Sequence, residues 1–415
     1  MARALASHHW LPFTQMAPGQ APVRTFVRAR GTRLFDDAGN DVFDAISSVW
    51  TTIHGHGHPA IVAAIARQAE ILDHVTALGA THPVAEELAA ALAAKTGLDR
   101  VLFAGDGASA IEAALKLALQ YWRNRGRPER TRFARLVAGY HGDTIGAMSV
   151  SDVGMFKAPF EAVTFESLPY DRASDVLSRP DLAAIIVEPL VQAAAGMRIV
   201  PSEHYDALRE RGDTLRERGE ALLIVDEIAT GFGRTGTMFA FEQLGLRPDL
   251  LTLGKGLSGG TLALSATLAR DEIFEEFSGA HADARHFFHG HSFAANPIAC
   301  AAALASLELF ESEGTLAHVA QLSAALEAPL ERLRAHPRVR EIRRAGLMCG
   351  IELVPDSVSG EGPTSGWNAA RALYARGHFT RPIGDTIQLV PPLSSSNAEL
   401  HAFVDALRDV LADAA

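Results

Sequence analysis

Residues 221–236 read ALLIVDEIATGFGRTG and residues 247–260 read RPDLLTLGKGLSGG, and these two stretches decide the fold. Each contains an apolar run, LLIV in the first and LLTL in the second. Runs without polar alternation predict parallel β-strands that are covered on both faces. Asp226 ends the first run and Lys255 follows the second. Because ligands bind at the carboxyl ends of parallel strands, we expect this acid and this amine to meet in one site.

The flanking sequence supplies the other parts of an α/β fold. AAIIVEP at 183–189 is a further buried strand that ends in an acid, Glu188, and residues 203–219 have the pattern of a helix. Alternation of strand, helix and strand is typical of a mostly parallel central sheet. From residue 296 the sequence changes to long helices rich in Ala and Leu and then to strands around 343–354. This change predicts a second, smaller α+β domain.

The chain is expected to divide into three parts. An N-terminal segment, residues 1–50, would join the small domain; residues 51–295 would form the large domain, and residues 296–415 the small one. The N-terminal segment reads as two or three short antiparallel strands between residues 23 and 48, with a turn at 37–40.

Composition narrows the class of protein. The chain has 415 residues, 48% of them hydrophobic and 21% charged, which is typical of a soluble globular protein. A formal net charge of −11 argues against a general nucleic-acid binder, and no apolar run reaches the length of a membrane span. The two cysteines, Cys300 and Cys349, lie in small apolar surroundings and do not make a disulfide framework. We therefore expect a cytoplasmic protein without nucleic-acid or membrane partners.

The two stretches also carry a resemblance. VDEIATGFGRTG followed by LGKGLSGG resembles the core of the class III (ω) aminotransferases, which have the fold-type-I architecture of pyridoxal-phosphate (PLP) enzymes. The resemblance implies PLP as the cofactor, Lys255 as the Schiff-base lysine and general base, and Asp226 as the partner of the pyridine nitrogen. These residue types suit the cofactor, because PLP needs an amine to hold it and a carboxylate to keep its ring nitrogen protonated.

Two further motifs are expected to bind the cofactor. Residues 106–122 predict a helix whose first amides, those of Gly107 and Ala108, would bind the cofactor phosphate, with Asp106 as the N-cap. In the family, the tyrosine–histidine pair of the motif GYHGDT supplies the aromatic face for the pyridine ring. Tyr140 would fill that role here and would also contact the substrate.

FFHGHSFAANP at 287–297 resembles the family segment that reaches the cofactor phosphate of the neighbouring subunit. The resemblance implies a homodimer with its active site at the interface. Gly290 would approach the substrate, and His291 and Ser292 would bind phosphate. The alternative is a surface loop whose histidine and serine have no ligand.

Residues near both ends of the chain resemble one subfamily. HWLPFTQM (9–16) and SSVW (47–50) are similar to segments of the adenosylmethionine–8-amino-7-oxononanoate aminotransferases. These enzymes convert 8-amino-7-oxononanoate to 7,8-diaminononanoate in biotin biosynthesis, with S-adenosylmethionine or, in some members, lysine as the amino donor. The resemblance implies that Phe13 and Trp50 line the substrate pocket. Arg381 would anchor the substrate carboxylate, which a guanidinium fork binds through two hydrogen bonds.

Parts of the sequence also match other functions. Another class III ω-amino acid or diamine transaminase is the nearest alternative function. GFGRTG at 231–236 has the spacing of a dinucleotide-binding motif, but no clear helix start follows it. No acid ends a second strand about 20 residues on, because Asp249 precedes its strand, and both points disfavour an NAD-dependent dehydrogenase. The histidines of HGHGHP (54–59) lack carboxylates at metal-binding spacing, so we predict a loop and no metal site.

Overall fold

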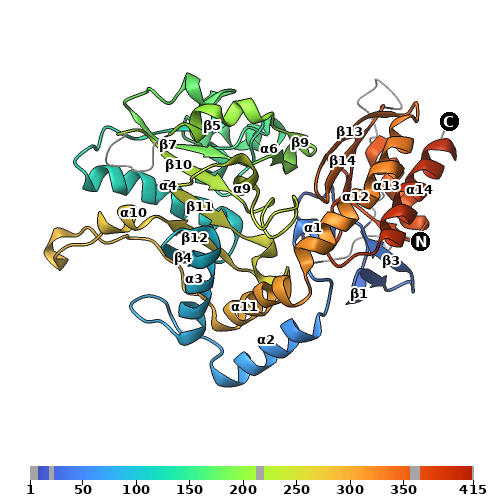
Figure 1. Cartoon of the computed structure of the whole chain (residues 1–415), viewed down its shortest axis with the longest axis horizontal. Coiled ribbons are helices and arrows are strands. Elements are labelled where there is room, and N and C mark those ends of the chain that lie inside the picture. The colour runs from blue at the N-terminus through green and yellow to red at the C-terminus, as the bar shows by residue number, and fades with distance from the viewer. Residues whose placement is uncertain (1–7, 18–22, 212–218, 356–364, 414–415) are drawn as a thin grey trace.

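The computed structural model describes residues 8–17, 23–211, 219–355 and 365–413. It has a larger part built around one sheet and a smaller part beside it, seen on the left and right of Figure 1.

A seven-stranded sheet forms the centre of the larger part. Its strands lie in the order β4 (Arg100–Ala104), β12 (Ser265–Ala269), β11 (Leu250–Leu253), β10 (Leu222–Asp226), β7 (Leu182–Val187), β5 (Arg132–Leu136) and β6 (Leu168–Tyr170). β12 is antiparallel to both of its neighbours, whereas the other strand pairs are parallel. The sheet is therefore mostly parallel, as predicted. β10 and β11 are adjacent, with Asp226 opposite Thr252, so their carboxyl ends share one edge.

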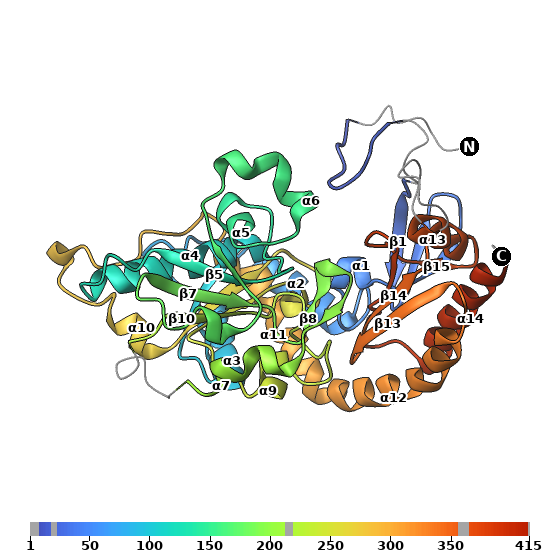
Figure 2. The same cartoon turned by 90° about the horizontal axis from the view of Figure 1, so that it is seen from above.

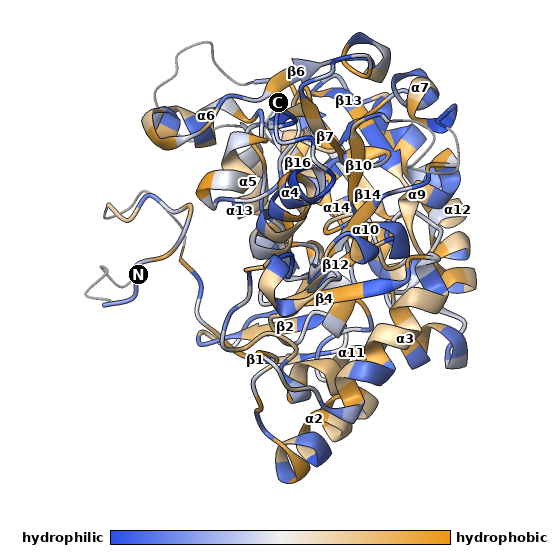
Figure 3. Cartoon of the chain, turned by 90° about the vertical axis from the view of Figure 1, so that its left-hand side faces the viewer, coloured by the Kyte–Doolittle hydropathy of each residue, from blue (hydrophilic) through white to orange (hydrophobic). Residues whose placement is uncertain are grey.

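The central strands are covered on both faces, as their apolar runs predicted. All five residues of β10 are buried. Leu222 and Ile224 pack into a core with α4, whereas Leu223 and Val225 pack into the core on the other face. The colours of Figure 3 show β7 and β10 as hydrophobic strands inside the molecule. Burying each such side chain stabilises the folded state by about 1.5–3 kcal/mol, so the sheet holds the residues at its edge in fixed positions.

Helices cover the two faces of the sheet, with α4 and α5 on one side and α3, α7 and α9 on the other (Figure 2). The helices of the larger part are α2 (Pro59–Ile71), α3 (Pro83–Thr96), α4 (Gly107–Asn124), α5 (Ile145–Ser149), α6 (Gly154–Lys157), α7 (Asp206–Arg209), α9 (Ala240–Leu244), α10 (Asp271–Glu275) and α11 (Pro297–Ser312). Proline opens α2, α3 and α11, each behind a residue whose side chain caps the helix, which explains where these helices begin.

The segment 203–219, predicted as a helix, is described only in part. The described residues there form a 3-10 turn, Ser202–Tyr205, and the single-turn α7, and residues 212–218 lie outside the described part. Arg211, just before these residues, is buried, and its guanidinium donates to Asp249. No helix among the described residues is long and apolar enough to cross a membrane.

The smaller part joins both ends of the chain. One sheet has the order β13 (Val339–Ala345), β14 (Met348–Leu353) and β16 (Thr386–Leu389), and the other has the order β1 (Phe26–Arg30), β2 (Arg33–Asp36), β3 (Asp41–Asp44) and β15 (His378–Phe379). The long helices are α12 (Thr315–Arg334), α13 (Ser365–Ala375) and α14 (Asn397–Asp413). The predicted N-terminal strands are confirmed, and β15 pairs with β3. The boundaries at residues 50 and 295 stay predictions.

A left-handed turn, labelled α1 (Ser47–Trp50), leads from the smaller part into the larger one. Its four residues have positive φ angles, from 47° at Ser47 to 68° at Trp50. This conformation costs roughly 1–2 kcal/mol for each residue that is not glycine. The buried Asp44 carboxylate holds the turn, because it accepts from the Ser48 N–H (3.2 Å) and hydroxyl (3.1 Å). His56 Nε2 lies 2.9 Å from the same carboxylate.

Candidate active site

A cavity of about 490 Å³ lies at the carboxyl ends of β10 and β11. Asp226 is the last residue of β10, and Lys255 follows β11 in a 3-10 turn, Lys255–Ser258. The structure therefore brings the predicted acid and amine to one site. Eight of the residues singled out from the sequence line the cavity: Trp50, Asp106, Gly107, Ala108, Tyr140, Glu188, Asp226 and Lys255.

The Lys255 amine lies inside this cavity beside an aromatic wall. Its Nζ is 5.3 Å from the centre of the Trp50 ring. Desolvation lowers the pKa of Lys255. The negative charges of Asp226 and Glu188 raise this pKa but do not cancel the effect of desolvation. A lowered pKa increases the fraction of neutral amine, which is the form that attacks a carbonyl or accepts a proton.

The Asp226 carboxylate is held by three hydrogen-bond donors. Its Oδ1 accepts from the Ile228 N–H (3.0 Å) and from the Thr252 hydroxyl (3.3 Å). Its Oδ2 lies 2.7 Å from Nδ1 of His141, which is buried. An ionised carboxylate only accepts, so Nδ1 carries the proton of the imidazole. The site thus presents a fixed, 4% exposed negative group to the cavity.

His141 was not predicted to contact Asp226. The signal available in the sequence was the tyrosine–histidine pair of GYHGDT, which was used for Tyr140 alone. Glu188, the acid predicted at the end of another buried strand, also lines the cavity, and its Oε2 accepts from the Tyr140 N–H (2.8 Å). Burial raises the pKa of Glu188 to about 7, and the charge of Asp226 adds to the shift.

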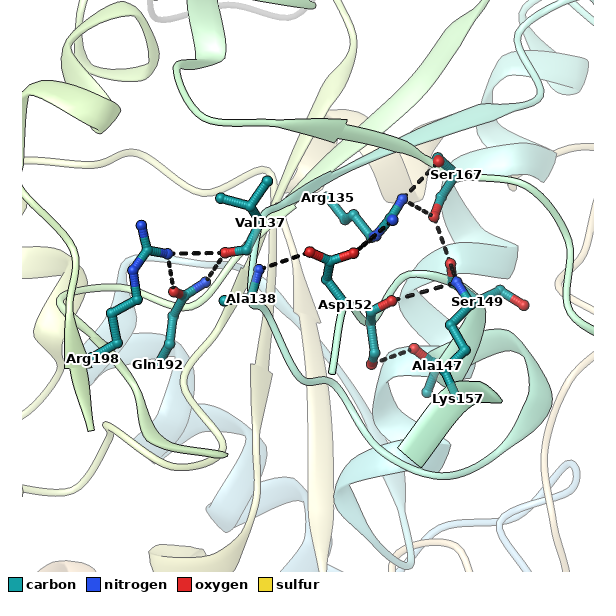
Figure 4. A network of polar contacts seen from close by, with 11 residues as sticks. Arg135, Val137, Ala138, Ala147, Ser149, Asp152, Lys157, Ser167, Gln192 and Arg198 are labelled. Atoms are coloured by element: carbon teal, nitrogen blue, oxygen red, sulfur yellow. Dashed lines mark hydrogen bonds and ion pairs between the residues drawn. The ribbon is translucent and has the colours of Figure 1, made fainter. Parts of the chain in front are cut away.

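A polar network holds the loop that carries the tyrosine and the histidine (Figure 4). Asp152 accepts from the Ala138 N–H (3.0 Å) and from Arg135 Nη2 (2.7 Å). On the other side of the loop, the Gln192 amide donates to the Val137 carbonyl (2.8 Å). Ala138 has a φ of 63°, so these bonds maintain a backbone conformation that alanine does not favour by itself.

The start of α4 forms another wall of the cavity. Asp106 is the N-cap, as predicted, because its carboxylate accepts from the Ser109 N–H (3.0 Å) and hydroxyl (2.8 Å). The first N–H groups of a helix have no partner inside the helix, so those of Gly107 and Ala108 form an anion site. A Cβ on Gly107 would lie 3.0 Å from Ile228, so this close approach favours glycine.

The predicted segment 287–297 does not line this cavity. Gly290, His291 and Ser292 lie outside it. The His291 ring lies near the loop before α4, with Cε1 3.5 Å from a Cβ built on Gly105. Its Nε2 is buried and has no hydrogen-bond partner within the described part of the chain.

Phe13 and Arg381 also lie outside the cavity but connect with it. Arg381 lines a second cavity of about 210 Å³, and its Nη2 donates to the Phe13 carbonyl (3.2 Å). Burial lowers the pKa of Arg381. The Phe13 ring meets Phe156 edge-on at 5.2 Å, and Phe156 meets Tyr140 edge-on at 6.1 Å. A row of aromatic rings thus leads from the N-terminal segment to the cavity.

The histidines of residues 54–59 do not converge on one point. His54 Nε2 lies 3.0 Å from a backbone oxygen, while those of His56 and His58 lie 2.9 Å and 3.0 Å from two different acids. Within the described ranges, no group of three or more His, Cys, Asp or Glu residues is arranged to hold a metal ion. Residues 231–236 form turns rather than the start of a helix.

Comparison with known proteins identifies the family of this site. The family model for aminotransferase class-III matches residues 15–411. The chain belongs to the class III aminotransferases. It is 41% identical to the adenosylmethionine-8-amino-7-oxononanoate aminotransferase of Synechococcus elongatus, over 97% of this chain and 98% of that protein. The predicted family is therefore confirmed.

Solved structures confirm the fold class of the aminotransferase. The crystal structure of adenosylmethionine-8-amino-7-oxononanoate aminotransferase from Methanocaldococcus jannaschii has a TM-score of 0.89 and 34% identity, covering 98% of this chain and 97% of that one. A PLP-bound amine transaminase from an uncultivated Pseudomonas species has a TM-score of 0.87 and 31% identity and covers all of both chains. The aminotransferase has the predicted α/β fold of PLP-dependent transferases.

The residues of the cavity fit the family cofactor, pyridoxal phosphate. The cavity offers an amine with a lowered pKa, a buried carboxylate held by three donors and an aromatic ring. The N-terminus of α4 supplies amides suited to a phosphate. These are the groups that a phosphorylated pyridine carbonyl compound requires.

Proposed function

We propose that this aminotransferase converts 8-amino-7-oxononanoate to 7,8-diaminononanoate in biotin biosynthesis, with S-adenosylmethionine as the amino donor. The reaction class rests on one observation, the cavity that contains the Lys255 amine, the Asp226 carboxylate and the Trp50 ring together. The substrate is supported by the names of relatives 38%, 41% and 40% identical over at least 97% of this chain, each an adenosylmethionine-8-amino-7-oxononanoate aminotransferase.

Lys255 and Asp226 have the two central roles in this proposal. Bound PLP supplies a carbonyl that exchanges amines and a ring that takes up electrons from a deprotonated carbon. Lys255 would hold the cofactor through its amine and take the proton from the α-carbon of the donor, a role that its lowered pKa favours. Asp226 would keep the ring nitrogen protonated, and His141 keeps that carboxylate in place.

The remaining cofactor contacts come from two walls of the cavity. The amides of Gly107 and Ala108 would bind the phosphate at the start of α4. Tyr140 would stack on the pyridine ring and contact the substrate, and burial raises the pKa of its hydroxyl, which therefore stays protonated. Glu188 orients this residue through the Tyr140 backbone.

The acceptor carries a carboxylate at the end far from its ketone, and Arg381 would bind it through two hydrogen bonds. Phe13 and Trp50 would pack along the aliphatic chain between these ends. The bond from Arg381 Nη2 to the Phe13 carbonyl supports a shared position for these two residues.

A second copy of the chain is expected to complete the site. Gly290, His291 and Ser292 lie outside their own cavity, which agrees with a role in a neighbouring one. Phe288 and Phe293, on the same segment, are 63% and 66% exposed, so the segment carries apolar surface that a homodimer would cover. Sedimentation of the holoenzyme at the mass of two chains is the expected result, and a monomer with full activity would contradict it.

The compartment proposed for the aminotransferase is the cytoplasm. Cys300 and Cys349 are both buried free thiols, and burial raises the pKa of each to about 12. Unpaired, unreactive thiols agree with a reducing compartment.

The decisive experiment separates the reaction from the choice of donor. Purified holoenzyme is mixed with S-adenosylmethionine or with lysine, and the absorbance of the bound cofactor is followed; the donor is the compound that bleaches it. Lys255→Ala should abolish turnover while circular dichroism shows an unchanged fold. Full turnover in that variant would exclude the proposed mechanism.

Another class III amine transaminase is the second candidate. The likeness to the Pseudomonas amine transaminase, which extends over all of both chains, favours it. The two candidates differ in their acceptor. Rapid amino transfer to 8-amino-7-oxononanoate supports the first, whereas transfer to pyruvate alone supports the second.

A further inference from the structure

One buried amide joins the two ends of the proposed substrate site. Gln388, on β16, is 1% exposed. Its Oε1 accepts from the Trp50 indole Nε1 (2.9 Å), and its Nε2 donates to the Arg381 carbonyl (2.6 Å). Trp50 faces the Lys255 amine, and Arg381 is the proposed carboxylate anchor. A single side chain therefore contacts both the reacting end and the anchoring end.

The partners determine how this amide is oriented. An indole N–H only donates and a backbone carbonyl only accepts, so the oxygen of Gln388 must face Trp50 and its nitrogen must face Arg381. Leucine at this position would provide neither bond. Glutamate, when ionised, would place an oxygen against the Arg381 carbonyl.

Gln388 is also the rigid member of the group. Its backbone lies in the sheet opposite Gly350 of β14, and its carbonyl accepts from the Thr380 hydroxyl (2.6 Å). Trp50, in contrast, ends the left-handed turn, and Arg381 follows the short strand β15. The sheet therefore provides a fixed reference for two residues that lie outside its strands.

We propose that Gln388 is a positioning residue that couples the Trp50 indole to Arg381, so that the guanidinium is held for a carboxylate while the ring is held beside Lys255. This inference rests on the proposed function, in which Arg381 binds the carboxylate of the acceptor. Its consequence is specific. Removal of the Trp50 N–H should weaken carboxylate recognition, because Gln388 links the indole to the Arg381 backbone.

The test uses the holoenzyme and two unreactive probes, nonanoate and 1-nonanol. Both have a nine-carbon chain without ketone or amine, and only nonanoate has a carboxylate. Calorimetry gives the two dissociation constants, and their ratio measures carboxylate discrimination without any turnover. In the unchanged protein the ratio should favour nonanoate by about 10- to 100-fold, the range of a charged hydrogen bond.

Gln388→Leu, Trp50→Phe and the double variant form a double-mutant cycle with the unchanged protein. Gln388→Leu and Trp50→Phe should each lower the discrimination ratio by about 3- to 10-fold, because each breaks the link between the indole and Arg381, which we expect to contribute about as much as one hydrogen bond. The double variant should lower it no further than either single change, because both changes break the same link. Gln68→Leu is the matched control, since it removes another buried glutamine, whose amide donates to the Leu72 carbonyl in α2. It should leave the ratio unchanged.

Arg381→Ala separates this inference from the proposed function. If Arg381→Ala abolishes discrimination but Gln388→Leu and Trp50→Phe do not affect it, the coupling is refuted, whereas carboxylate binding by Arg381 is supported. Additive losses in the double variant also refute the coupling. If Arg381→Ala leaves discrimination intact, the anchor fails and the coupling fails with it. Should Gln388→Leu not fold, Trp50→Phe alone decides, because it removes one N–H and keeps an aromatic ring.

Discussion

Replacement of Asp226 by asparagine tests whether the site depends on one buried charge. Asparagine keeps the shape and can still present an oxygen to the Ile228 N–H and the Thr252 hydroxyl. Its NH2 group must then face Nδ1 of His141, which lies 2.7 Å from the carboxylate. His141 would have to move its proton to Nε2, which has no partner within the described ranges. The substitution therefore removes a charge and also forces His141 into the tautomer that is protonated at Nε2.

The size of the effect follows from these contacts. Three charge-assisted bonds would each weaken by about 1 kcal/mol, and the unpaired N–H of His141 would cost about 1–3 kcal/mol more. For a chain of 415 residues, 1 kcal/mol corresponds to about 1 °C, so the melting temperature should fall by about 4–6 °C. Two unit charges 4 Å apart at an effective dielectric constant of 20 attract by about 4 kcal/mol, which corresponds to about a 10³-fold loss in kcat/KM.

The assay measures kcat/KM for amino transfer, the dissociation constant of the cofactor and the melting temperature of the apo-protein. Asp249→Asn is the matched control. Asp249 is fully buried at the opposite end of β10, where it accepts from the Leu223 N–H (2.8 Å) and from Arg211 Nη2 (3.1 Å). This variant should lose stability as well, while its kcat/KM and its affinity for the cofactor stay close to those of the unchanged protein.

The reasoning would be refuted if Asp226→Asn kept more than about a tenth of kcat/KM, a loss of less than about 1.4 kcal/mol. It would also fail if Asp249→Asn lowered kcat/KM as much as Asp226→Asn. In that case the loss would come from general destabilisation and not from the charge at the end of β10.

Two further predictions concern stability. Burial raises the pKa of Glu188 from 4.5 to about 7, so the folded protein favours the protonated carboxyl. The stability that depends on this protonated group is fully present below pH 4.5 and is lost as the pH rises through 7. The unfolding free energy of the apo-protein relative to Glu188→Gln, measured with urea, should fall by about 3 kcal/mol over that range, and a constant difference would contradict this. Val49 has a φ of 64°. Val49→Gly should raise the melting temperature by up to about 1 °C, because relief of the left-handed conformation exceeds the entropy cost of glycine. Val62→Gly, at an exposed position in the right-handed α2, should lower it, and equal losses in both variants would argue against strain in the turn.

Local sequence was sufficient where the structure depends on short-range patterns. The apolar runs predicted β10 and β11 as doubly covered strands, and the residues that end them predicted a shared site for Asp226 and Lys255. The position of Asp106 before an amphipathic helix predicted its N-cap bond. Each of these features is determined within a few residues, by burial of one strand or by the unpaired amides of one helix end.

Contacts between distant segments could not be read in this way. The bond between His141 and Asp226 depends on where a loop, braced by its own network, places one ring. The sequence contained the tyrosine–histidine pair but not the direction of the imidazole.

The sequence by itself determined the fold class, the family and the acid–amine pair at the strand ends of this aminotransferase. The tertiary structure alone decided how the substrate side is assembled. Trp50 and Gln388 are 338 positions apart, and the strained left-handed turn that presents Trp50 is held by contacts outside it. Such pairings depend on the packing of the whole chain, because a hydrogen bond forms only when both groups are brought within about 3 Å in the right orientation, and no local pattern encodes that distance.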